Sequence, residues 1–204
     1  MYLAKKIKAI FFDLDGVLVN AVQVHFEALN KALKLFGYVI EEEEQHGVYN
    51  GLPTKKKLRL LSERKGLPKE IHGIIGSMKA KYTIDLLKKA CKPSYRKILM
   101  LKYLKKKGIE LVCCSNAQRE SVIRMLTASE LLDYFEFVIG NDEGVRPKPA
   151  PDLYLEAYGR VNLKKDEVII VEDADHGYKA AIDSGCPNVI KVDGYEDVDL
   201  SLFL

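Results

Sequence analysis

The chain has 204 residues, of which 48% are hydrophobic and 30% are charged, and its formal net charge is +3 at pH 7. This composition is typical of a folded globular protein, and the small net charge disfavours a nucleic-acid partner. The apolar runs are too short to span a membrane, and the first one ends in two aspartates, unlike a signal peptide. We therefore expect a cytoplasmic monomer with no membrane partner, in which four cysteines stay reduced: Cys91, Cys113, Cys114 and Cys186.

The first predicted element, Ile7–Phe12, is a short run rich in β-branched and aromatic residues that leads into Asp13, Asp15 and Gly16. This pattern predicts a buried parallel strand that ends in a turn. The carboxyl end of such a strand is where open α/β sheets bind ligands. Two carboxylates at i and i+2 can reach one hard cation such as Mg²⁺, or one can be left free to attack a substrate. A solvated Asp-x-Asp-Gly turn is the alternative.

The next 75 or so residues contain helical periodicity and no convincing strand. The apolar spacing predicts amphipathic helices over about 22–36, 55–64 and 69–90. We interpret this stretch as an insertion, which divides the chain into a helical cap, 18–91, and a core made of 1–17 and 92–204.

From residue 93 onward, predicted helices and strands alternate. The predicted strands cover 109–114, 135–140, 168–171 and 188–192. The predicted helices cover 93–107, 115–129, 152–160 and 174–184. Alternation of this kind is typical of a parallel sheet with helices on both faces. The predicted fold class is therefore α/β, with a doubly wound, Rossmann-like core.

Polar residues also follow the later strands. Ser115 and Asn116 come directly after the strand at 109–114, at the start of a predicted helix. A hydroxyl and backbone N–H groups at a helix N-terminus form an anion site. The run from Ser115 to Gln118 also matches a capping box. Both roles are compatible, because a capping serine can still donate to a phosphoryl oxygen.

Lys148 lies between Pro147 and Pro149. The two prolines restrict the backbone and predict a stiff, extended loop that aims one ammonium group at a fixed point. An ordinary surface lysine is the alternative, and the flanking prolines favour a functional role.

Glu172 and Asp173 follow the fourth predicted strand. Adjacent acids after four apolar residues are poor candidates for the core, and one of them can join Asp15 in holding a cation. Asp175 and His176 are expected to form the solvated first turn of the next helix, where an acidic residue suits the helix dipole.

Taken in order, successive strand ends carry a carboxylate pair, a hydroxyl, a lysine and a second acidic pair. This set contains a nucleophile, a cation site and positive charge for a phosphoryl group. The four motifs resemble those of the haloacid dehalogenase superfamily of phosphotransferases over the whole core. The helical insertion after the first motif resembles the β-phosphoglucomutase-like group of that superfamily.

The resemblance implies a role for each acidic residue. Asp13 would be the nucleophile that forms an aspartyl-phosphate. Asp15 would be the general acid and base, with its backbone carbonyl on Mg²⁺. The implied magnesium site comprises Asp13, Asp15, Glu172 and Asp173, and Asp173 is expected to be a direct ligand.

The resemblance also implies phosphate-binding residues in the core. Ser115 and Lys148 would bind the transferring phosphoryl group, and Asn116, next to Ser115, is a further phosphate-binding candidate. Since Mg²⁺ and Lys148 offset the negative charge of both reactants, an anionic nucleophile could approach an anionic phosphate.

In the cap, four residues match substrate-facing or hinge positions of the family. His25 matches a hinge position used by sugar-phosphate mutases, although a helix-face residue is an equal alternative. Gly51, Thr54 and Lys55 are candidates for a loop that faces the substrate. Asn20 stands where many relatives carry an acidic residue, a departure that concerns the hinge more than the chemistry.

We therefore expect a Mg²⁺-dependent phosphatase for a small phosphorylated metabolite such as a sugar phosphate. A phosphosugar mutase is the alternative enzyme, but no arginine stands between Gly51 and Leu58, where the mutases would place a phosphate-binding one, and Thr54 matches that position. Dehalogenation and phosphonate cleavage are disfavoured because Asp15 is present. A non-catalytic phosphometabolite sensor is the alternative from another class.

Overall fold

The computed structural model describes residues 6–49, 52–141 and 144–204. Contacts divide the chain into two compact units, one formed by the chain up to Asn20 together with the chain from Cys91 onward, the other by Ala21–Ala90. We refer to them as the core unit and the helical unit. None of the helices in the described ranges is long and apolar enough to cross a membrane.

The core unit is built on a single five-stranded parallel sheet with the order β3-β2-β1-β4-β5. Its strands are β1 (Ala9–Phe12), β2 (Glu110–Cys114), β3 (Phe137–Ile139), β4 (Val168–Glu172) and β5 (Val189–Lys191). All four residues of β1 are fully buried, as expected for a central strand covered on both faces. This sheet confirms the predicted α/β fold class.

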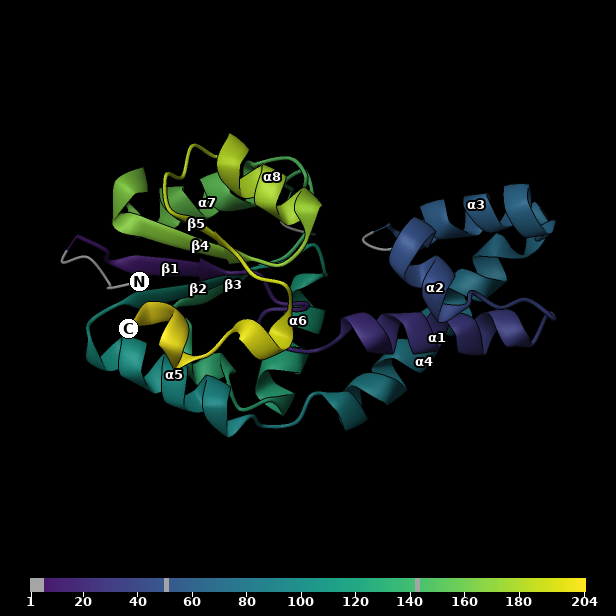
Figure 1. Ribbon diagram of the computed structural model, residues 1–204, viewed down its shortest axis with the longest axis horizontal. Helices are drawn as coiled ribbons and strands as arrows, with labels where there is room; N and C mark the ends of the chain where they lie inside the picture. Colours follow the sequence, from purple (N-terminus) through teal and green to yellow (C-terminus); the bar gives the residue numbers. More distant parts are fainter. Residues whose placement is uncertain (1–5, 50–51, 142–143) are drawn as a thin grey trace. The chain divides into compact units, whose positions relative to one another are not determined.

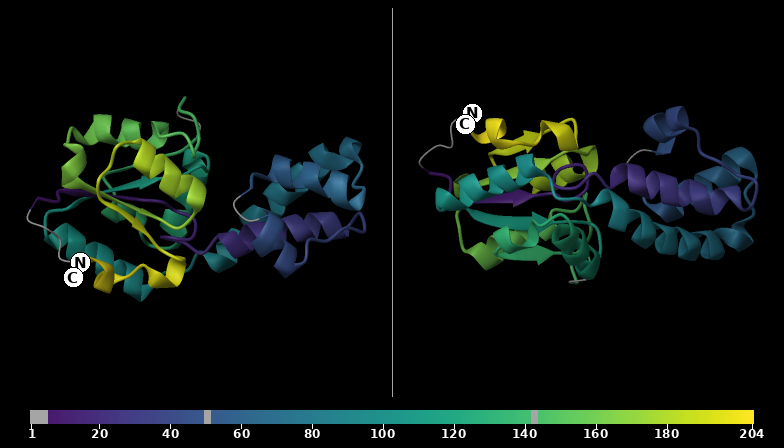
Figure 2. Two further views of the ribbon diagram at one scale, coloured as in Figure 1. Left: turned by 45° about the horizontal axis from the view of Figure 1, so that its top comes forward. Right: turned by 90° about the horizontal axis from the view of Figure 1, so that it is seen from below.

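Helices cover both faces of the sheet (Figure 1). They are α5 (Tyr95–Lys106), α6 (Arg119–Ala128), α7 (Asp152–Val161) and α8 (Asp175–Asp183). Helices α7 and α8 lie on one face, and α5 lies on the other beside the C-terminal segment, as Figure 1 and the left view of Figure 2 show. Since parallel strands share a direction, the segments after β1, β2 and β4 all emerge at the same edge of the sheet.

Helix α6 begins later than the sequence pattern predicts. Its first residue is Arg119 and its N-cap is Gln118, so the expected helix start and capping box at Ser115 are wrong. The Ser115 N–H instead donates to the carbonyl of Ile139 at 3.0 Å and prolongs the pairing of β2 with β3. A long-range sheet hydrogen bond therefore prevails over the local capping pattern.

The helical unit, Ala21–Ala90, lies within the stretch 18–91 that the sequence pattern predicts as an insertion. Its elements are α1 (Val22–Lys34), α2 (Glu42–Glu44), a π-helical turn (Gln45–Tyr49), α3 (Thr54–Lys65), a 3₁₀ turn (Lys69–Ile71) and α4 (His72–Ala90). Helix α1 packs against α4, and these two helices run side by side in Figures 1 and 2. The unit has its own apolar core, which includes Phe26, Leu29, Leu33, Leu58, Leu61 and Ile75.

Candidate active site

A one-turn loop follows β1 and carries the first pair of acids. The N–H of Gly16 donates to the Val19 carbonyl at 2.8 Å, and the N–H of Val19 donates to the Leu14 carbonyl at 3.0 Å. Gly16 has φ +84°, and a Cβ on it would lie 2.0 Å from an oxygen of Asp173. Only glycine therefore allows this turn to pass so close to the second acidic pair.

Lys148 occupies the middle of the site. Its ammonium donates to Asp13 Oδ1 at 2.5 Å, to Glu172 Oε1 at 2.7 Å and to the Cys114 carbonyl at 2.8 Å. Only 1% of the Lys148 side chain is exposed, so this is a buried ion-pair network and not a solvated lysine. An ammonium group has three N–H donors, and these three contacts use all of them.

The backbone at Lys148 is held by Asn116. The Lys148 N–H donates to Asn116 Oδ1 at 2.8 Å, and the Asn116 amide donates back to the Lys148 carbonyl at 3.1 Å. Nearby, Arg146 makes a two-pronged contact with Asp152, at 2.9 and 3.0 Å. The stiffness that the prolines predict therefore has a second source, the side chain of Asn116. Direct binding of phosphate by Asn116 stays a prediction.

Ser115 lies at the end of β2 and is 2% exposed. Its Oγ accepts a hydrogen bond from the N–H of Ala117 at 3.1 Å, which forms a local turn. The hydroxyl remains able to donate, because an acceptor role leaves its O–H available. The contact between Ser115 and a phosphoryl group stays a prediction.

Three carboxylates gather at the same edge of the sheet. Oxygens of Asp13, Glu172 and Asp173 all lie within 4.8 Å of one another. The Asp15 carboxylate is near enough to raise the pKa of both Asp13 and Asp173. A set of hard oxygen ligands with excess negative charge fits Mg²⁺. The cluster could therefore hold a magnesium ion.

Burial dominates the titration of these acids. It raises the pKa of Glu172 to about 7, with Lys148 opposing the shift. Burial and the charge of Asp13 raise the pKa of Asp173 to about 6. For Lys148 the order is reversed: burial lowers its pKa, but the Asp13 and Glu172 carboxylates together hold it above the ordinary value. The lysine is thus charged at neutral pH, and the acids repel one another.

Sequence reasoning missed two residues around Glu172, Tyr154 and Gly177, and it wrongly placed His176 in a solvated turn. Tyr154 is fully buried on α7, and its hydroxyl donates to Glu172 Oε1. Gly177 on α8 leaves room for the carboxylate, because a Cβ there would lie 2.1 Å from Glu172 Oε2. His176 is half-buried rather than solvated, and its pKa is lowered by burial. A tyrosine on the apolar face of a helix was an available signal, since a buried hydroxyl needs a partner.

The residues that the sequence analysis singled out in the cap lie in the helical unit. His25 Nδ1 lies 3.3 Å from Lys79 Nζ. Thr54 is the first residue of α3 and Lys55 is exposed, whereas Gly51 lies outside the described residues. Lys57 is half-buried, and its pKa is lowered to about 8 by burial and by Lys79. Substrate contacts of these residues stay predictions.

The chain is similar in sequence to phosphatases and similar in fold to a β-phosphoglucomutase. The chain is 26% identical over 188 residues to a phosphorylated carbohydrates phosphatase from Thermotoga maritima, covering 91% of this chain and 85% of that protein. It is 26% identical over 195 residues to a phosphoglycolate phosphatase from Rhodobacter capsulatus, covering 94% and 87%. The crystal structure of a β-phosphoglucomutase from Clostridium difficile shares the fold, with a TM-score of 0.75, 20% identity and coverage of 96% and 95%.

The family itself is shown by a direct match. The model of the haloacid dehalogenase-like hydrolases matches residues 10–191, which include β1 from its second residue, the other four strands of the sheet and every acidic residue of the site. The chain therefore belongs to the haloacid dehalogenase-like hydrolase family, as its four motifs predict.

Proposed function

We propose that this hydrolase is a Mg²⁺-dependent phosphatase that acts on a small phosphorylated metabolite such as a sugar phosphate, through an aspartyl-phosphate. The observation that carries the proposal is the position of the Lys148 ammonium, 2.5 Å from Asp13 and 2.7 Å from Glu172. One positive charge is thus held beside the proposed nucleophile. It lies at the edge of the sheet where β4 ends in the second acidic pair, Glu172 and Asp173. The phosphatase names of the two full-length relatives support the same reaction class.

The residues of the site divide the reaction into two displacements. Asp13 attacks phosphorus, an Asp13–phosphorus bond forms, and the bond to the leaving oxygen breaks. Asp15 gives its proton to that oxygen. In the second displacement, Asp15 takes a proton from water, the water oxygen attacks phosphorus, and the Asp13–phosphorus bond breaks. Lys148 neutralises phosphoryl charge in both steps, and Ser115 donates a hydrogen bond to a phosphoryl oxygen.

Asp13, Asp173 and the backbone carbonyl of Asp15 would hold the magnesium ion, and Glu172 would complete the site. When bound, the ion supplies positive charge that offsets the repulsion between carboxylates and phosphate. The residues fit this role because they are hard oxygen ligands and oxygens of Asp13, Glu172 and Asp173 lie within 4.8 Å of one another.

Two other functions can be weighed against this one. A mutase needs a second phosphate site in the cap, and Thr54 stands where a mutase would carry an arginine. A phosphometabolite sensor needs no nucleophile, yet Asp13 is present and paired with Lys148. Both considerations favour the phosphatase.

The experiment is hydrolysis of p-nitrophenyl phosphate with Mg²⁺ by the wild type, Asp13→Asn and the matched control Asp133→Asn, whose side chain is exposed. We expect Asp13→Asn to lose at least about a thousandfold in kcat, because removal of the attacking group leaves only binding and charge effects. Asp133→Asn should retain wild-type activity. Substantial turnover by Asp13→Asn would overturn the assignment of the nucleophile.

A further inference from the structure

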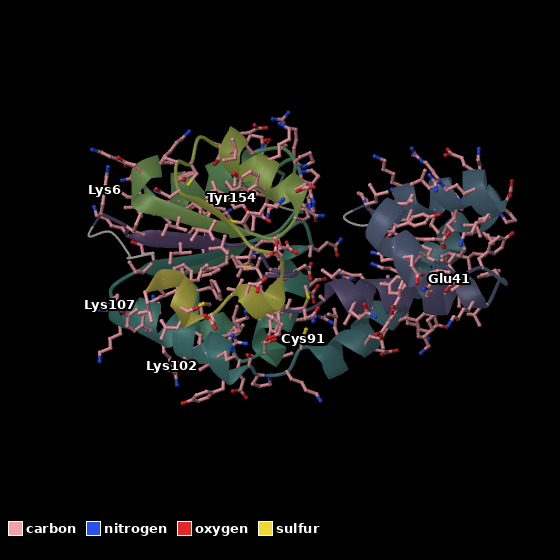
Figure 3. All side chains as sticks on the ribbon, viewed as in Figure 1. Lys6, Glu41, Cys91, Lys102, Lys107 and Tyr154 are labelled. Atoms are coloured by element: carbon pink, nitrogen blue, oxygen red, sulfur yellow. The ribbon has the colours of Figure 1, made fainter. Side chains whose placement is uncertain are left out.

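Tyr154 lies beside the site, and the proposed chemistry does not use it. It lies on α7, is labelled in Figure 3, and is 0% exposed. Its hydroxyl donates to Glu172 Oε1, and the Lys148 ammonium lies 4.8 Å from the centre of its ring. Tyr154 thus contacts both members of the Lys148–Glu172 pair, once through its hydroxyl and once through its ring.

Lys148 has no N–H group left over for a phosphoryl oxygen, because each one already has an acceptor in the protein. All three N–H groups of Lys148 are in use, on Asp13, Glu172 and Cys114. A phosphoryl oxygen that arrives at Asp13 can be contacted by Lys148 only if one of these acceptors is released. A buried acceptor that loses its only donor destabilises the state in which the donor is missing. Lys148 can therefore most easily give up an acceptor that also receives a hydrogen bond from a second donor.

Glu172 Oε1 is such an acceptor. It receives hydrogen bonds from both Lys148 and Tyr154, so it stays hydrogen-bonded when Lys148 turns away. Gly177 leaves room for the Glu172 carboxylate at this position, because a Cβ there would lie 2.1 Å from Glu172 Oε2. Tyr154 itself is held in place by its complete burial on α7.

We propose that Tyr154 is a positioning residue that holds the Glu172 carboxylate and frees one N–H of Lys148 to pass from Glu172 to the phosphoryl group. The inference rests on the proposed phosphatase function, since it concerns the same site. Tyr154 does not touch the reacting atoms. It acts by keeping Glu172 hydrogen-bonded in both states of the lysine, so that binding of phosphate does not leave a buried oxygen without a donor.

The test uses inorganic phosphate as the probe, with Tyr154→Phe compared against Tyr158→Phe. Tyr158 is also buried, lies one turn further along α7, and its hydroxyl contacts the Lys165 carbonyl at 3.5 Å, away from Glu172. Calorimetry in Mg²⁺ measures the phosphate dissociation constant, and steady-state kinetics separate KM from kcat. We expect Tyr154→Phe to weaken phosphate binding about tenfold and to raise KM similarly. Tyr158→Phe should leave both within about twofold.

A double-mutant cycle with Glu172→Ala tests whether Tyr154 acts through Glu172. In the Glu172→Ala background, Tyr154→Phe should have little further effect on phosphate affinity, because the oxygen that accepts from the Tyr154 hydroxyl is gone. Equal losses in Tyr154→Phe and Tyr158→Phe, unchanged phosphate affinity in Tyr154→Phe, or fully additive effects in the cycle would each overturn the proposal.

NMR and calorimetry of the wild type cover the cases in which a variant does not fold or the protein is not a phosphatase. If Tyr154→Phe does not fold cooperatively, NMR of the wild type decides: phosphate should shift the Lys148 Nζ signal and leave the Tyr154 hydroxyl bonded, and the reverse pattern would contradict the inference. Calorimetry needs no turnover, so a wild type that binds phosphate but hydrolyses no phosphomonoester would reject the phosphatase function alone, and the role of Tyr154 would still be decided by the affinities.

Discussion

Asp13 and Lys148, 135 residues apart in the chain, form a buried ion pair with 2.5 Å between Oδ1 and Nζ. The side chain of Lys148 is 1% exposed and that of Asp13 is 12% exposed, so neither charge is well solvated. Such a pair has a consequence beyond catalysis, because a buried charge that loses its partner is costly.

Lys148→Met should therefore reduce both activity and stability. Removal of the ammonium leaves the Asp13 and Glu172 carboxylates buried without their cation, and we expect a loss of about 3–5 kcal/mol in the free energy of unfolding. The control is Lys105→Met, which breaks an exposed pair with Glu136 and should cost less than about 1 kcal/mol. Urea unfolding of both variants without Mg²⁺ checks the difference, and equal losses would contradict it.

Magnesium affinity should depend more on Asp173 than on Glu172. Glu172 Oε1 already accepts from Lys148 and Tyr154, whereas Asp173 sits against Gly16, within reach of Asp13. Asp173→Asn should thus raise the Mg²⁺ concentration for half-maximal activity by more than Glu172→Gln does, by about tenfold or more. A titration of Mg²⁺ against both variants gives the order, and a reversed order would show that Glu172 is the direct ligand.

Asp173→Asn should also stabilise the metal-free protein, in a pH-dependent way. The pKa of Asp173 is raised from 3.8 to about 6 by burial and by Asp13. The folded state therefore holds this proton more tightly than the unfolded state, and ionisation destabilises the fold as pH rises between these two values. Because the side chain is half-buried, we expect a gain on the order of 1 kcal/mol above pH 7 and none below pH 4. Urea unfolding in chelator from pH 4 to 8 measures this, and a gain that grows towards low pH would have the wrong sign.

Gly177→Ala should impair the site, whereas Gly159→Ala should not. A Cβ at Gly177 would lie 2.1 Å from Glu172 Oε2, so Glu172 has to move and its contacts with Lys148 and Tyr154 are disturbed. We expect a loss of about 1–3 kcal/mol in stability, as for overpacking, together with lower activity. Gly159 lies inside α7 with no atom within 4 Å of its Cβ position, and alanine there should stabilise by up to about 1 kcal/mol. Thermal unfolding and a phosphatase assay on both variants test the contrast.

The choice of phosphatase over mutase is tested with β-glucose 1-phosphate. Thr54 and Lys55 replace the bidentate arginine that the family resemblance places in mutases, so the cap should hold a second phosphate poorly. We expect release of inorganic phosphate and no build-up of glucose 6-phosphate. ³¹P NMR follows both products in one experiment, and clean conversion to glucose 6-phosphate would identify a mutase.

Local pattern alone was enough to predict the sheet and the acids at its edge. The apolar run before Asp13 and the run before Glu172 are strands, and both ends meet because neighbouring strands in a parallel sheet share their direction. The helical insertion was predictable for the same reason, since periodicity is a property of short segments. These features depend on residues close together in the chain.

The partners of these residues were decided by the tertiary structure. The start of α6 moved from Ser115 to Arg119 because a sheet hydrogen bond to Ile139 outweighs a local cap. The Asn116 amide binds the backbone of Lys148, and the Tyr154 hydroxyl binds Glu172. No local pattern contains these contacts, because each joins segments that meet only when the sheet forms, and each is fixed by the need of a buried polar group for a partner.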